Sequence, residues 1–303
     1  MGDGEIYDLL NRAYESEDAD EVAKLVERAL ALEPDNPEAL LLKADLTEED
    51  EERLPFLERA LEGTRRYIRD EGLTDEDFLE DETGLVHLAL LQRAAYTLFS
   101  LEEDDRSLEL VEELLRYDHE DLAMAKTLYY RILLEQKEWA RALEETMREP
   151  SRGLGWAYAR IVATFMLAGG NGKVKEAREK AREKNGRNLN KMLWDAVRMA
   201  PNVPFYMLGY MPDPVDESED ENFHFSLLFE DVLSTSRDLQ NWFSKGTILF
   251  GLLTGRFGEE SDDMREILAT LGGAADYKEL ASHLKDASDA AALDALAAGN
   301  HPR

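Results

Sequence analysis

The stretch EIYDLLNRAYESEDADEVAKLVERALALEPDNPEALLLKADL, from Glu5 to Leu46, shows the pattern that runs through most of the chain. Apolar residues recur in it every three or four positions, which places them on one face of an α-helix. Two turn-forming segments, ESEDAD and LEPDNPEA, divide it into three helices. Because each helix has one apolar face to bury, the stretch predicts successive helices that pack against one another.

The same helical spacing continues along the chain, and no segment alternates in the way a β-strand would. The sequence therefore predicts an all-α protein. Further helix pairs are predicted within residues 91–114, 125–145 and 155–186. Between the second and third pairs, a charged insertion near residues 62–83 interrupts the spacing, and Pro55 is predicted to open the helix before it.

The first helix pair resembles a tetratricopeptide repeat, a helix–turn–helix unit of about 34 residues. The positions that match its packing residues are Ile6, Leu9, Leu10, Ala13, Val22, Val26, Ala29 and Pro34. The resemblance implies a right-handed α-α superhelix with a concave groove. We expect the repeat array over residues 1–200 and a helical C-terminal cap over residues 201–303. A helical bundle without repeats is the alternative.

The chain is strongly acidic along its whole length. Its 303 residues include 66 Asp and Glu against 35 Lys and Arg, a formal net charge of -31. Such even acidity is similar to that of cytosolic proteins from salt-accumulating halophiles of the haloarchaeal type, because molar salt screens the repulsion between carboxylates. An ordinary acidic protein is the alternative. Nucleic-acid binding by the surface as a whole is disfavoured, since it requires clustered cations.

The composition also narrows the chemistry. Cysteine is absent, so the chain has no disulfide and no thiolate site. The first residues lack the features of a signal peptide, and no apolar run is long enough to span a membrane. We therefore expect a cytoplasmic protein.

No catalytic, cofactor or metal motif emerges. The five histidines lack the spacing of a metal-binding helix. The segment GGNGKV, Gly169 to Val174, has the wrong spacing for a phosphate-binding loop, because Leu167 and Val174 stand where a glycine and a hydroxyl are needed. The sequence thus predicts a protein that is not an enzyme and holds no cofactor.

The tetratricopeptide resemblance implies which positions of the first helix in each pair face a partner in the groove. These positions carry aromatic and polar side chains, and tyrosine gives a large contact area with a hydrogen-bonding tip. They are Tyr7, Asn11, Tyr14, Gln92, Tyr96, Phe99, Lys126, Tyr130 and Tyr158. The alternative is that several of them simply pack between helices.

A second candidate surface is a basic segment in this acidic chain. Its cations are Lys173, Lys175, Arg178, Lys180, Arg182, Lys184, Arg187 and Lys191. This segment is predicted to dock an acidic partner or RNA. The alternative is an exposed helix stabilised by pairs such as Glu176 with Lys180.

The stretch APNVPFYMLGYMPDPV, Ala200 to Val215, contains four of the nine prolines. Together with Trp242, it resembles the C-terminal part of the suppressor-of-tumorigenicity-seven family through Asn202, Val203, Pro204, Tyr206 and Leu208. That resemblance implies a scaffold without catalytic residues. We expect a structural joint here, with Tyr206 and Leu208 packed beneath it.

These patterns together predict a non-enzymatic scaffold that binds a peptide or helix of another protein. The alternative is an enzyme or a nucleic-acid-associated regulator that acts through the basic segment and the C-terminal region.

Overall fold

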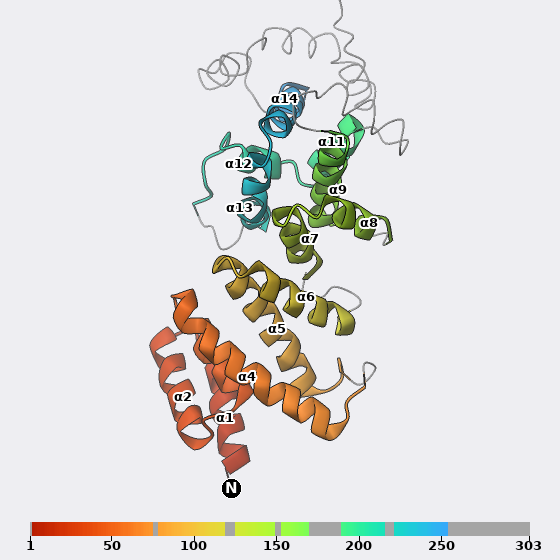
Figure 1. The fold of residues 1–303 in the computed structure, drawn as a ribbon. Coiled ribbons are helices and arrows are strands. Elements are labelled where there is room, and N and C mark those ends of the chain that lie inside the picture. The colour runs from red at the N-terminus through yellow and green to blue at the C-terminus, as the bar shows by residue number, and fades with distance from the viewer. Residues whose placement is uncertain are drawn as a thin grey trace, which may run out of the picture. The chain divides into compact units, whose positions relative to one another are not determined.

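The computed structural model describes residues 2–74, 78–118, 125–148, 153–169, 189–215 and 221–253. Every regular element in these ranges is a helix, which confirms the predicted all-α class (Figure 1). The chain divides into two compact units, Met1–Ile132 and Leu133–Arg303. The division falls within α7 (Ala125–Glu135) and differs from the boundary predicted after residue 200.

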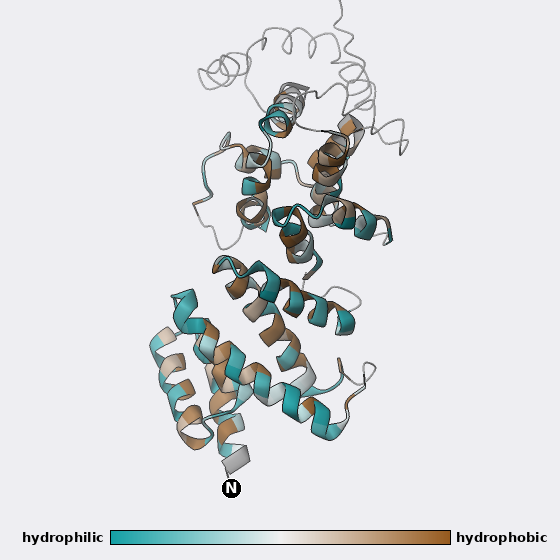
Figure 2. Cartoon of the chain, in the orientation of Figure 1, coloured by the Kyte–Doolittle hydropathy of each residue, from teal (hydrophilic) through white to brown (hydrophobic). Residues whose placement is uncertain are grey.

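The N-terminal unit contains six helices before α7. They are α1 (Gly2–Glu15), α2 (Ala19–Leu32), α3 (Pro37–Asp45), α4 (Asp50–Glu71), α5 (Glu82–Ser100) and α6 (Asp104–Tyr117). Each packs against the next. Figure 2 shows apolar residues concentrated on α5, whereas α4 and α6 carry long hydrophilic stretches. Since both of these helices pack on α5, it is the central helix of this part of the unit.

Most of the predicted packing positions in the first helix pair are buried. Ile6, Leu9, Leu10, Ala13, Val26 and Ala29 form one apolar cluster with Leu25 and Ala39, and Val22 lies at its edge. Pro34 is exposed in the turn after α2. The turn ends where the side chain of Asn36 accepts a hydrogen bond from the backbone N–H of Ala39, which caps α3.

The helices α3 and α4 lie alongside α5 and α6 in the same direction. Three ion pairs establish this register: Asp45 with Arg93, Glu58 with Arg106, and Arg65 with Glu113. Every pair joins residues 48 positions apart. Because the separation in sequence is the same for all three ion pairs, residues of α3 and α4 lie next to the residues 48 positions later in α5 and α6. The local offset exceeds the 34-residue period of the tetratricopeptide pattern because α4 is long and a loop follows it.

The prediction that Pro55 opens a helix was wrong, because α4 begins earlier, at Asp50, and contains Pro55. Acidic residues in the first turn, Asp50 to Glu52, favour this start because they interact with the positive end of the helix dipole. Arg53 also holds the start in place. Its guanidinium donates hydrogen bonds to the backbone carbonyls of Ala44 and Thr47, which lie at the end of α3.

The segment predicted as a charged insertion begins as the last turns of α4 and ends at α5. Gly72 ends α4 with a φ of 67°, a left-handed conformation that glycine adopts without strain. Phe78 then enters the core with no exposed surface and stacks on Tyr117 at a centroid distance of 4.1 Å. A Cβ atom on Gly84 would lie 2.2 Å from the carbonyl oxygen of Phe78, so this close approach requires glycine.

The second unit contains α8 (Trp139–Arg148), α9 (Leu154–Leu167), α11 (Leu189–Met199), α12 (Val203–Met207), α13 (Glu221–Ser234) and α14 (Arg237–Leu253). Its core is aromatic. Tyr158 of α9 lies 5.4 Å from Phe225 and 6.0 Å from Phe243, measured between ring centroids. Phe165 stacks on Trp242 at 5.4 Å. These contacts tie α9 to α13 and α14.

The proline stretch forms a helical joint within this unit. Pro201 follows α11, and Pro204 lies in the first turn of the short helix α12, as expected from its fixed φ angle. The residues packed beneath the joint differ from those predicted. Phe205 is 1% exposed and Met207 is buried, whereas Tyr206 and Leu208 are half-buried. The five-residue helix turns Phe205 toward Phe250 of α14.

Replacing Tyr158 by phenylalanine is expected to raise the free energy of unfolding of the second unit by about 1 kcal/mol. The hydroxyl of Tyr158 is buried without a hydrogen-bond partner among the described residues, and burial raises its pKa. Removing it relieves a desolvation cost and leaves the ring in place. Urea unfolding followed by tryptophan fluorescence measures the change, and Tyr67→Phe, on exposed α4 surface, is the control, followed by circular dichroism. A lower free energy of unfolding in Tyr158→Phe would mean that the Tyr158 hydroxyl does make a stabilising hydrogen bond.

Candidate functional site

The residues predicted to face a partner fall into three groups by exposure. On α1, Tyr7 is 61% exposed, Tyr14 is 54% exposed, and Asn11 is exposed between them. The half-buried group comprises Gln92, Tyr96 and Phe99 of α5 and Lys126 of α7. The buried group comprises Tyr130 and Tyr158. Among the predicted positions, all of which are described, the aromatic side chains with more than half of their surface exposed are on α1.

For Tyr130 and Tyr158, the packing alternative is correct. Tyr130 is 3% exposed and Tyr158 is 1% exposed, so neither ring offers a surface to a partner. Phe99 is also covered on one face, because the guanidinium carbon of Arg131 lies 5.1 Å from its ring centroid. The aromatic surface open to a partner is consequently the α1 end of the predicted set.

We call Tyr7, Asn11 and Tyr14 the tyrosine stripe. Successive residues of an α-helix are about 100° apart, so these three side chains share one side of α1 within about 60°. Asp8 and Glu15 occupy the adjacent strip, and both are exposed. Neither carboxylate pairs with a cation of the described chain, whereas Arg12 on the same helix pairs with Glu21 of α2. The stripe thus has unpaired negative charge along one side.

The other side of the stripe meets α3 at Glu38. Partial burial and the nearby Glu82 raise the pKa of the Glu38 carboxyl, and a hydrogen bond with Tyr14 lowers it in part. Burial and Glu38 also raise the pKa of the Tyr14 hydroxyl. Tyr14 is nevertheless 54% exposed, so its contact with Glu38 leaves part of the side chain open to solvent. Carboxylates therefore lie on both sides of the stripe.

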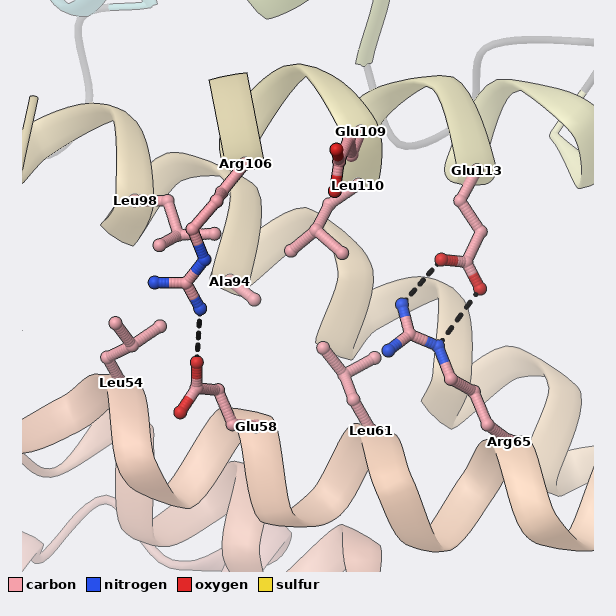
Figure 3. A pocket seen from close by; sticks show the side chains of 10 residues that line it. All are labelled: Leu54, Glu58, Leu61, Arg65, Ala94, Leu98, Arg106, Glu109, Leu110 and Glu113. Atoms are coloured by element: carbon pink, nitrogen blue, oxygen red, sulfur yellow. Dashed lines mark hydrogen bonds and ion pairs between the residues drawn. The ribbon is translucent and has the colours of Figure 1, made fainter. Parts of the chain in front are cut away.

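A second surface feature is the groove between α4 and α6, with α5 as its floor (Figure 3). Its volume is about 310 Å³. Apolar side chains line it: Leu54, Leu61, Ala94, Leu98 and Leu110. An ion pair crosses it at each end, from Arg106 to Glu58 and from Arg65 to Glu113. The groove is a seam between stacked helices that charged pairs hold together.

Behind the groove lies a buried polar network that the sequence did not reveal. His87 of α5 is 1% exposed, with Nδ1 2.7 Å from the hydroxyl oxygen of Thr64 on α4. Its Nε2 lies 3.4 Å from Glu113 of α6. Thr64 and His87 are buried and the Glu113 side chain is 16% exposed at the edge of the groove, so the three groups join α4, α5 and α6. The sequence could not show that His87 lies between α4 and α6, because that position depends on how the helices pack.

Acid is expected to destabilise the N-terminal unit through Glu113. Partial burial alone would raise the pKa of this carboxyl, but hydrogen bonds from His87 and Arg65 outweigh that effect and lower it from 4.5 to about 2. A depressed folded-state pKa gives stability that is complete above pH 4.5 and lost as the pH falls toward 2. The loss is on the order of 2 to 3 kcal/mol.

Urea unfolding at a series of pH values tests this expectation. Glu113→Gln should be less stable than the wild type near neutral pH, and the two curves should converge in acid. Glu109→Gln, a change on the exposed part of the same helix, serves as the control and should follow the wild type throughout. If the difference in free energy of unfolding between Glu113→Gln and the wild type were the same at every pH, the role of the Glu113 charge would be contradicted.

The other predicted sites are not all within the described residues. Lys173, Lys175, Arg178, Lys180, Arg182, Lys184 and Arg187 lie outside them, and only the helical backbone of Lys191 is described. Across the described ranges, no three His, Asp or Glu side chains come together as metal ligands. None of the helices described is long and apolar enough to cross a membrane.

The comparisons with known proteins give no further guide. No family model and no curated protein matches this chain. The tetratricopeptide resemblance and the function argued from it therefore rest on the residues and geometry given above.

Proposed function

We propose that this chain is a non-enzymatic scaffold that binds a peptide or helix of another protein on the face carrying the tyrosine stripe. The observation that carries the proposal is the pair of open rings, Tyr7 and Tyr14, two turns apart on one side of α1. Tyrosine is enriched where proteins bind one another, because its ring gives a large contact area and its hydroxyl a hydrogen bond.

The way the helices stack supports the proposal. The constant offset of 48 residues between ion-paired positions is what repeated helix pairs produce. Arrays of such pairs, including tetratricopeptide repeats, present one helix of each pair on a continuous inner surface. Asp45 of α3 bonds to Arg93 of α5 at 3.0 Å, which ties the first helices of two successive pairs together. A rigid surface of this kind binds a partner at low entropic cost.

The acidic composition supports a further part of the proposal, a cytoplasm rich in salt. With a formal net charge of -31, the folded chain repels itself, and molar salt reduces the Debye length to about 3 Å. Under those conditions apolar and aromatic contacts carry more of the binding energy than long-range attraction does. The open rings of the stripe suit such a medium.

A partner purified with the tagged full chain from its native cells provides the test. Tyr7→Ala and Tyr14→Ala are each expected to weaken binding of the purified partner by about 1 to 2 kcal/mol, because each removes a central aromatic contact. Isothermal titration calorimetry measures the affinity, and circular dichroism checks that each variant is folded. Tyr67→Ala, which removes an exposed tyrosine of α4, is the matched control and should bind normally. Equal affinity for all three variants would contradict the proposal.

A further inference from the structure

We infer that the partner of the tyrosine stripe is a basic segment whose arginine or lysine side chains lie over the rings of Tyr7 and Tyr14. The inference rests on the proposed function, because it gives the chemistry of the partner bound at that face. Three independent features of α1 and α3 lead to it: the open rings, the carboxylates beside them and the spacing between the rings.

The rings themselves favour a cation. The face of a tyrosine ring carries partial negative charge and attracts a guanidinium or ammonium group placed over it. The N-terminal unit already contains this contact, where Arg131 lies over Phe99 at 5.1 Å. Tyr7 and Tyr14 have no such cover among the described residues, and their exposures of 61% and 54% leave ring surface free for it.

The carboxylates add charge complementarity from both sides. Asp8 and Glu15 are exposed next to the stripe and pair with no described cation. On the opposite side, burial raises the pKa of Glu38, which means that its negative charge is poorly solvated. A cation over the Tyr14 ring would lie near Glu15 and Glu38 and would offset this cost. An acidic peptide or a phosphate backbone would instead meet repulsion from the same groups.

Three cations of α1, α3 and α5 already form ion pairs with carboxylates outside the stripe. Arg12 of α1 pairs with Glu21 of α2, and Arg93 of α5 pairs with Asp45 of α3. Lys43 of α3 pairs with Glu27 of α2 at 2.5 Å. These pairs leave Asp8 and Glu15 without a described cation partner, and a basic segment of a partner would supply one.

The spacing of the rings sets the spacing of the cations. Seven residues of α-helix rise about 10 Å, so the two ring positions are about 10 Å apart along α1. A helical partner matches this distance with basic residues seven positions apart. A partner in the polyproline II conformation matches it with basic residues three positions apart, which share one side at about 3.1 Å per residue. The expected partner therefore carries a pair of arginines or lysines at one of these two spacings.

The test uses synthetic peptides and the full chain. The first probe is an alanine-based helical peptide with two arginines seven positions apart, and the matched probe has glutamine at both positions. Fluorescence anisotropy measures binding at low and at molar salt. We expect the arginine peptide to bind and the glutamine peptide to bind at least 10-fold more weakly, since the cations provide the attraction.

Variants of the chain then distinguish the stripe from acidic surface in general. Tyr7→Ala and Tyr14→Ala are each expected to lower the affinity for the arginine peptide by about 3- to 30-fold, because each removes one cation–ring contact. Tyr14→Phe keeps the ring and should retain most of the affinity. Tyr67→Ala should bind as the wild type does, because this exposed tyrosine of α4 lies among Arg65, Arg66 and Arg69 and outside the tyrosine stripe.

Three results would overturn the inference: no preference for arginine over glutamine, unchanged binding after both alanine substitutions, or an equal loss in Tyr67→Ala. Each of them leaves the proposed function standing if the purified partner still loses affinity in Tyr7→Ala and Tyr14→Ala. If that partner also binds all variants equally, the proposed function fails as well. The two proposals are thus separated by which ligand responds to the same substitutions.

Discussion

Replacing Phe78 by alanine is expected to lower the free energy of unfolding of the N-terminal unit by about 3 to 5 kcal/mol. Phe78 has no exposed surface, although it lies in the segment between α4 and α5. Its ring stacks on Tyr117 of α6 and meets the edge of His87 of α5 at 5.7 Å. Deleting it leaves a cavity beside the buried network of His87 and Glu113, so the two rings that contact it lose packing at the same time.

Two optical signals measure this effect. All four tryptophans of the chain lie after residue 132, so tryptophan fluorescence follows the second unit, whereas far-ultraviolet circular dichroism follows helices of both. Phe78→Ala should lower the urea midpoint seen by circular dichroism more than the midpoint seen by fluorescence. Leu79→Ala, the adjacent residue at 38% exposure, is the control and should change either midpoint little. An equal loss in both variants would contradict the anchoring role of Phe78.

Replacing Phe205 by aspartate is expected to destabilise the second unit by at least about 4 kcal/mol. Phe205 is 1% exposed and its ring lies 6.3 Å from that of Phe250 in α14. The substitution removes a buried ring and places a carboxyl group in apolar surroundings, where either the charge or the proton uptake costs free energy. Val203, Pro204 and Met207 of α12 are buried as well, so the new carboxyl group has no short route to water.

Leu208→Asp is the matched comparison for this joint. The sequence pattern predicted Leu208 as the packed residue, but its side chain is half-buried at the end of α12, where a carboxylate reaches water. Its cost should therefore be well below that of Phe205→Asp when both are measured by urea unfolding and tryptophan fluorescence. A larger loss in Leu208→Asp would mean that the joint packs as the sequence alone suggested.

Much of the helical architecture could be predicted, because helical periodicity is a local property of the chain. The spacing of Ile6, Leu9 and Leu10 identified the buried side of α1, and that of Val26 and Ala29 did the same for α2. In each case the residues that decide the outcome lie within a few turns of one another.

The candidate site was only partly predictable. The tetratricopeptide resemblance implied that Tyr7, Tyr14, Tyr130 and Tyr158 occupy corresponding sides of their helices, yet the first two are exposed and the last two are buried. The difference comes from neighbours remote in sequence: Phe225 and Phe243 cover Tyr158, and they belong to α13 and α14. A sequence pattern shows which residues share a side of a helix, but it does not show which other helix will cover that side.

By itself, the sequence determined the all-α class, the positions of most helices and the acidic character of the chain, since these follow from composition and short-range spacing. Only the tertiary structure decided that Phe78 enters the core, that His87 joins Thr64 to Glu113, and that ion pairs recur at an offset of 48 residues. These contacts depend on the length of α4 and on how closely Gly84 lets the chain approach. Such packing is set by the shape of all the side chains together, and no local pattern encodes it.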